Sequence, residues 1–155
     1  MIIMKTLFYY FIAYSVVTLI ASLHFLFNWK VRKLEAFDTS LGLRSLLANA
    51  TKFEAFITTK PFHSIYNLLV FPIVSVIMML QFSSIPTIAQ GIVIGILWLL
   101  YCVIFDLIFW VLIPHPWRLT LNELFVTYQP WITLAYVAIA VSPVISVLYI
   151  TYFVN

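Results

Sequence analysis

The chain has 155 residues, of which 65% are hydrophobic and only 8% are charged. Soluble domains carry about 25% charged residues, so this composition excludes a soluble globular protein and indicates a membrane protein with several spans. The formal net charge is only +3, and the basic residues are not arranged as a surface for nucleic acid, which excludes that partner. The single cysteine, Cys102, excludes an internal disulfide and a metal cage built from cysteines.

Four segments are apolar and long enough to cross a bilayer, which takes about 20 mostly apolar residues in a helix. They are residues 6–29, 61–82, 87–113 and 130–154. No small-residue cleavage site is evident near the first segment, so we expect a retained helix rather than a signal peptide. The sequence therefore predicts one transmembrane domain, residues 1–155, built as an all-α bundle of four helices.

The distribution of lysine and arginine predicts how the bundle is oriented. Six of the eight basic residues lie between the first two spans, Arg118 lies between the last two, and Lys5 precedes the first. Loops that carry positive charge stay in the cytoplasm. We therefore expect an integral, multi-pass protein with its first and third loops cytoplasmic and both termini outside.

Two shorter helices are expected on the cytoplasmic side. Apolar residues recur at three- and four-residue spacing over residues 43–58, which indicates an amphipathic helix in the membrane interface. This helix either anchors the loop or forms a lid over a site beneath it. In the third loop, Thr120 and Glu123 fit a capping box and predict a short helix over residues 121–128.

Small residues indicate which helix faces pack together. Gly91 and Gly95 are four residues apart, a spacing that lets membrane helices approach closely. Ala138, Ser142 and Ser146 repeat the same spacing in the last span. Asp106 shares a helix face with Gly95, so its side chain is predicted to point into the bundle.

Polar side chains inside a span usually face protein or water, because lipid offers them no partners. All three histidines and the only carboxylate within a span fall in the cytoplasmic half, and the outer half is nearly free of ionisable groups. Asp106 lies about 10 Å from the end of its span, at a rise of about 1.5 Å per residue. The sequence therefore predicts a polar pocket at the cytoplasmic leaflet, built from His24, His63, Asn67, Asp106, His115 and Arg118.

The same residues have a structural interpretation. Asp106 could hold helices together by pairing with Arg118 or by bonding a tyrosine or histidine. Two facing histidines, such as His24 and His63, could hold a haem, and imidazole with carboxylate could hold a divalent metal. The three histidines come from separate segments without the spacing of a known metal motif, so cofactor and metal both stay open.

Three classes of function remain. The first is a ligand-binding protein or an accessory subunit of a membrane complex, with a lipid or other amphiphilic ligand, partner subunits or a second copy as partners. The second is a membrane enzyme acting on a lipid or isoprenoid, with Asp106, His115 and His63 as catalytic groups and the other three residues binding the substrate. The third is a small proton-coupled transporter in which Asp106 carries the proton.

Overall fold

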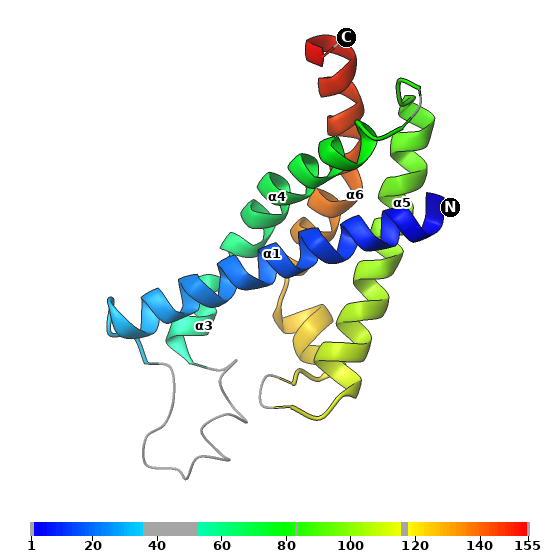
Figure 1. The fold of residues 1–155 in the computed structure, drawn as a ribbon. Coiled ribbons are helices and arrows are strands. Elements are labelled where there is room, and N and C mark those ends of the chain that lie inside the picture. The colour runs from blue at the N-terminus through cyan, green and yellow to red at the C-terminus, as the bar shows by residue number, and fades with distance from the viewer. Residues whose placement is uncertain (1, 36–52, 83, 116–117, 155) are drawn as a thin grey trace.

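The computed structural model describes residues 2–35, 53–82, 84–115 and 118–154, and the regular structure within them is helical (Figure 1). The long helices are α1 (Ile2–Lys30), α4 (Phe62–Met79), α5 (Ile88–Asp106) and α6 (Trp131–Tyr149). The shorter ones are α3 (Glu54–Thr59) and three π-helical segments, η2 (Leu107–Leu112), η3 (Glu123–Thr127) and η4 (Ile150–Val154).

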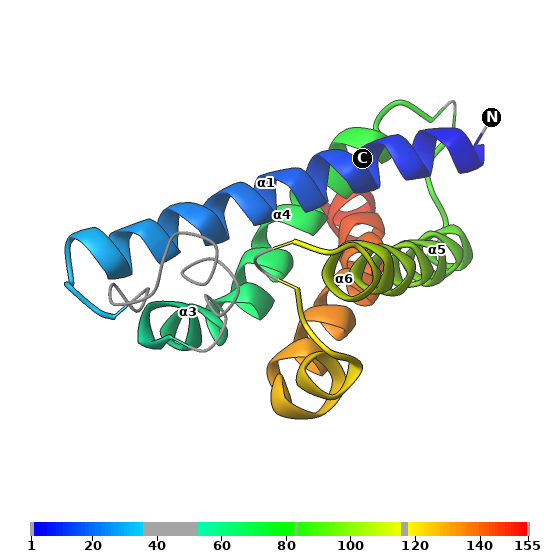
Figure 2. The same ribbon diagram turned by 90° about the horizontal axis from the view of Figure 1, so that it is seen from below.

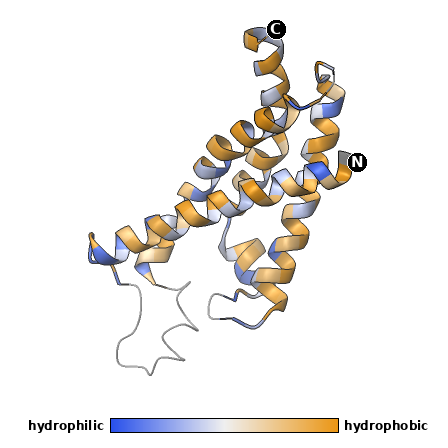
Figure 3. Ribbon diagram, viewed as in Figure 1, coloured by the Kyte–Doolittle hydropathy of each residue, from blue (hydrophilic) through white to orange (hydrophobic). Residues whose placement is uncertain are grey.

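Four helical stretches are long and apolar enough to cross a membrane, which confirms the predicted four-span, all-α architecture. They are Ile3–Lys30, Phe62–Met79, Ile88–Leu112 and Trp131–Val154. Hydrophobic residues cover most of their length (Figure 3). The second helix ends at Met79 rather than at residue 82, because Gln81 and Phe82 already form turn-type hydrogen bonds. The chain is a small polytopic membrane protein.

The helix α6 lies between α4 and α5 and packs against both, while α1 crosses the bundle obliquely (Figures 1 and 2). The first half of α1 touches α5: the indole Nε1 of Trp98 donates to the Thr6 carbonyl oxygen at 3.0 Å. Its second half diverges from α5 and packs against α3 instead. Both chain ends and the α4–α5 turn lie at one end of the bundle, and α3 and η3 lie at the other.

The predicted small-residue faces lie in contacts between helices, that of α5 against α6 and that of α6, at Ser146, against α4. A Cβ added to Gly95 would collide with the carbonyl oxygen of Ala140, so the two backbones are in direct contact there. Gly91 is also in contact, although less tightly, with Val147 Cγ2 3.1 Å from the position of an added Cβ. On the other side of α6, Ser146 Oγ donates to the carbonyl oxygen of Pro72 on α4 at 2.9 Å. These contacts place the small residues of α5 and α6 in the packed interior.

Local sequence signals account for the two short helices. Glu123 N–H donates to Thr120 Oγ1 at 3.1 Å, and Thr120 N–H donates to Glu123 Oε2 at 2.8 Å, so the predicted capping box is present. Helical structure follows it, as expected for residues 121–128. Of the predicted interfacial helix over 43–58, the described part is helical over Glu54–Thr59, and residues 43–52 lie outside the described residues. Its position in the interface stays a prediction.

The helix α3 is held against α1 by a buried polar contact. The Asn28 side chain is fully buried, and its Nδ2 donates to Thr59 Oγ1 at 3.1 Å. Ala55 of α3 is also fully buried and packs against Phe25 of α1. This contact fixes α3 at the end of the bundle where the histidines and Asp106 lie.

Candidate functional site

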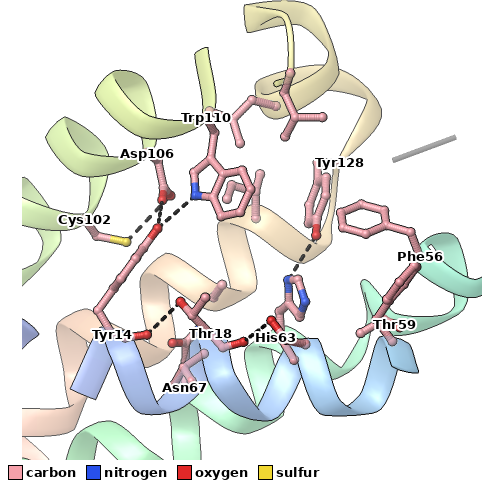
Figure 4. A pocket seen from close by; sticks show the side chains of 18 of the residues that line it. Tyr14, Thr18, Phe56, Thr59, His63, Asn67, Cys102, Asp106, Trp110 and Tyr128 are labelled. Carbon is pink, nitrogen blue, oxygen red and sulfur yellow. Dashed lines mark hydrogen bonds between the residues drawn. The ribbon is translucent and has the colours of Figure 1, made fainter. Parts of the chain in front are cut away.

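A cavity of about 530 Å³ lies between the spans, toward the end of the bundle that holds α3 and η3 (Figure 4). All four spans contribute to its wall, together with α3 and η3. Apolar and aromatic side chains form most of the wall, among them Phe25, Leu124 and Ile132. Small-molecule sites measure about 300–1,000 Å³ and combine apolar walls with a few polar groups, so this cavity is the candidate site.

The first polar group in the wall is the carboxyl of Asp106, which is only 6% exposed. Its Oδ1 accepts a hydrogen bond from the Tyr14 hydroxyl at 3.0 Å, and its Oδ2 accepts one from the Tyr136 hydroxyl at 2.9 Å. Cys102 Sγ lies 3.7 Å from Oδ2, and Trp110 Nε1 donates to the Tyr14 hydroxyl oxygen at 2.8 Å. The carboxyl therefore joins α5 to α1 and α6.

The local helix geometry changes at this point of the chain. The α-helical part of α5 ends at Asp106, and the π-helix η2 begins at Leu107. Trp110 lies about one turn further on, from where its indole reaches Tyr14. Short π-helical segments within longer helices occur frequently at functional sites, so this change agrees with a site at Asp106.

The second polar group comes from α4. His63 Nδ1 lies 3.0 Å from the Tyr128 hydroxyl, and both residues line the cavity. Burial raises the pKa of Tyr128, which keeps its hydroxyl protonated and able to donate to the imidazole. Asn67 lies one helical turn after His63 and is 6% exposed. In Figure 4 the Asp106 and His63 groups lie apart from each other, with Asn67 below Tyr14.

A lysine lies beside the wall without being part of it. Lys60 Nζ is 4.8 Å from the ring centroid of Tyr128 and 5.7 Å from that of Phe56, and both rings line the cavity. Burial lowers the pKa of Lys60, and the charge of Glu123 opposes this shift. The cation thus lies over the rings of two aromatic residues of the wall.

Of the six residues predicted to form the pocket, His63, Asn67 and Asp106 line this cavity, and the other three do not. His24 shares a hydrogen bond with the Tyr66 hydroxyl through Nδ1. The His115 ring bonds the Phe109 carbonyl oxygen, and Arg118 Nε donates to the Val111 carbonyl oxygen at 2.8 Å. The two loop residues therefore brace the end of η2.

Sequence reasoning considered arginine, tyrosine or histidine as partners of Asp106, and the structure places two tyrosines there. It did not single out Tyr136, Trp110 or Tyr128 as members of the site. Tyr14 carried a usable signal, because it shares a helix face with His24 and Asn28 in the predicted first span. The other three stand out in no pattern of a chain that is 18% aromatic.

Within the described ranges, no cluster of three or more His, Cys, Asp or Glu side chains could hold a metal ion. The polar groups of the cavity can instead form hydrogen bonds to a bound molecule or exchange protons with it. Comparison of the chain with protein-family models, with characterised proteins and with solved structures found no match.

Proposed function

We propose that this protein binds a small amphiphilic molecule in the cavity between its membrane spans. The supporting observation is the cavity itself: about 530 Å³ of space with mostly apolar walls and two separate polar groups, around Asp106 and His63. An empty apolar cavity lowers stability in proportion to its volume, so a bound molecule would stabilise the bundle. The ligand reaches the cavity from the bilayer, which dissolves amphiphiles.

The proposal includes an orientation in which the cavity faces the cytoplasmic leaflet. Lys30 ends α1, Lys60 follows α3 and Arg118 bonds the end of η2, all near the elements that form the cavity wall. Lys5 Nζ instead donates to the carbonyl oxygen of Gln81, just beyond the opposite end of α4. Positively charged loops are retained in the cytoplasm. A ligand taken from the inner leaflet would therefore enter near its binding site.

The same function fits an accessory subunit of a membrane complex. Side chains such as Ile73, Val93 and Val137 are about half exposed on the outer faces of α4, α5 and α6. In a bilayer these faces contact lipid, and in a complex they would contact other spans. The cavity then supplies a bound molecule to the assembly.

A second candidate is acid–base chemistry on the bound molecule. Asp106 and His63 are two titratable groups in the wall of one cavity, which is the arrangement that supports this alternative. His115, proposed from the sequence as a third catalytic group, does not line the cavity. An enzyme would be supported if the Asp106→Asn variant still binds the molecule but, unlike the wild type, leaves it chemically unchanged.

Native mass spectrometry of the protein, released from membranes in a mild detergent, tests the binding function. The expected result is a monomer carrying one defined mass excess that corresponds to an organic molecule. Ala135→Phe places a ring into the cavity, because Ala135 lines it and is 6% exposed, and should remove that mass. The matched control is Ala89→Phe, at an exposed position on α5.

Two results would count against the proposal. One is a wild-type protein that carries no mass excess under conditions that preserve loosely bound lipid. The other is an Ala135→Phe variant that folds and retains the same adduct as the wild type. A shift of the wild-type mass to that of a larger protein assembly would identify the accessory subunit.

A further inference from the structure

Asn67 is a buried polar side chain without a hydrogen-bond partner in the part of the chain that the structure describes. It is 6% exposed and lines the cavity (Figure 4). The other polar side chains of the wall that could bond it, those of Tyr14, Asp106 and Tyr128, already form hydrogen bonds of their own. A buried amide without a partner is costly, so one that faces a cavity is placed to bind what enters it.

His63 adds a donor one helical turn away on the same face of α4. When Tyr128 donates to Nδ1, the neutral imidazole carries its proton on Nε2. No hydrogen bond to Nε2 occurs within the described residues. At a rise of about 1.5 Å per residue, the two side chains start about 6 Å apart along the helix. They offer one N–H from the imidazole, and two N–H donors and one carbonyl acceptor from the amide.

The charge of the wall restricts what these groups can bind. No lysine or arginine among the described residues lines the cavity, whereas the carboxyl of Asp106 does. A phosphate or carboxylate in this cavity would lose its hydration without gaining a positive partner. An uncharged hydroxyl or carbonyl loses far less and is fully satisfied by an amide.

The depth of Asn67 within the membrane span also favours an uncharged ligand. The helix α4 begins at Phe62, and Asn67 lies five residues into it, about 7.5 Å along the axis. Anionic lipid heads stay in the hydrated interface, and moving one this deep is expensive. A neutral head can reach this level together with its chain.

We propose that the cavity selects an uncharged amphiphile whose hydroxyl or carbonyl oxygen binds Asn67, with His63 Nε2–H beside it, and whose hydrocarbon part fills the apolar wall. This inference rests on the proposed binding function and adds to it the chemical class of the ligand. The amide of Asn67 forms hydrogen bonds to the polar group of the ligand. Residues such as Phe25 and Ile132 contact its hydrocarbon part.

The test compares two probes with the same hydrocarbon chain, hexadecanol and the permanently anionic hexadecanesulfonate. Each is titrated into the purified full-length protein in a non-ionic detergent, and the bound fraction is counted by native mass spectrometry. The wild type should bind the alcohol about tenfold or more tightly than the sulfonate, because burying an unpaired charge is costly.

The matched variants are Asn67→Leu, which keeps the side-chain volume and removes the amide, and Asn122→Leu at an exposed position outside the cavity. Asn67→Leu should weaken hexadecanol binding about five- to tenfold, the value of one neutral hydrogen bond, and Asn122→Leu should not change it. The thermal midpoint of ligand-free Asn67→Leu should equal or exceed that of the wild type, since no internal hydrogen bond is lost.

The outcomes separate this inference from the binding function. If the wild type binds both probes equally or prefers the sulfonate, the inference is overturned while the binding function stands. Unchanged hexadecanol binding by a folded Asn67→Leu variant overturns it as well. A wild-type protein that binds neither probe and carries no adduct overturns both. If Asn67→Leu does not fold, the preference of the wild type between the two probes still decides.

Discussion

The hydroxyl of Tyr14 on α1 donates a hydrogen bond to Asp106 on α5 at 3.0 Å, across a sequence separation of 92 residues. Tyr136 on α6 donates to the other carboxyl oxygen at 2.9 Å. One carboxyl thereby connects three of the four spans. Since α1 meets α5 only through its first half, this connection lies where α1 begins to diverge and the cavity opens.

We expect loss of the Tyr136 hydroxyl to destabilise the bundle modestly. Side-chain hydrogen bonds between membrane helices contribute about 0.6 kcal/mol on average and up to about 1.7 kcal/mol, so Tyr136→Phe should lower the free energy of unfolding by that amount. Asp106→Leu should cost more, because it leaves two partly buried hydroxyls without an acceptor. Thermal unfolding in mild detergent would measure the order wild type, Tyr136→Phe, Asp106→Leu.

The matched control is Tyr152→Phe, since Tyr152 is 75% exposed near the end of the last span. Its thermal midpoint should equal that of the wild type. An Asp106→Leu protein as stable as the wild type would show that the carboxyl does not hold the helices together.

The contact between α5 and α6 predicts unequal effects of two glycine substitutions. At Gly95 an added Cβ meets the carbonyl oxygen of Ala140, which is backbone and cannot rotate away. At Gly91 the contacts are 3.1 Å to Val147 Cγ2, a side-chain methyl, and 3.2 Å to backbone atoms of Pro143 and Val144. Gly95→Ala should therefore destabilise by about 1–3 kcal/mol, the usual cost of overpacking, and Gly91→Ala by less.

Steric-trap unfolding of the two variants in the same detergent would compare these costs. Equal stabilities, or the reverse order, would mean that α5 and α6 are further apart at Gly95 than the structure places them.

The capping box of the last loop predicts a local effect. Thr120→Ala removes the oxygen that accepts from Glu123 N–H, and loss of such a cap costs about 0.5–2 kcal/mol. Amide hydrogen exchange over residues 121–128 should accelerate, with little change in the core of α6. Thr127→Ala is the control, because Thr127 is exposed in the same helix. Equal exchange in both variants would show that the cap does not hold this helix.

The proposed orientation can be tested with single cysteines in a Cys102→Ala background. Ser84→Cys lies in the α4–α5 turn and Asn122→Cys lies after the third span, and both positions are exposed. In intact cells, a membrane-impermeant maleimide should label Ser84→Cys and should reach Asn122→Cys only after permeabilisation. The opposite pattern would place the cavity at the outer leaflet and reverse the proposed orientation.

Much of the fold could be predicted from the sequence because its causes are local. Lipid supplies no hydrogen bonds to a backbone, so each long apolar stretch must form a helix, and length alone yields four spans. The spacing of Thr120 and Glu123 likewise produces a cap without help from the rest of the chain. The spacing of Gly91 and Gly95 identified the packed face of α5, although not which helix packs there.

Which residues form the site could be predicted only in part from the sequence. Helical periodicity states which residues share a face, but rotation and tilt decide which neighbour that face meets. His24 lies at a depth similar to His63, yet it meets Tyr66 outside the cavity wall. Arg118 is close to Asp106 in sequence, yet it bonds the Val111 carbonyl oxygen because the loop turns back on η2.

The sequence by itself therefore determined a four-span membrane protein with its polar residues gathered toward one end. Hydrophobic length and charge are properties of each segment alone. Only the tertiary structure decided that Tyr14 and Tyr136 bind Asp106, that Tyr128 binds His63, and that a cavity remains beside Asn67. Those outcomes depend on how each helix is rotated and tilted against its neighbours, which is set by contacts between segments far apart in the chain.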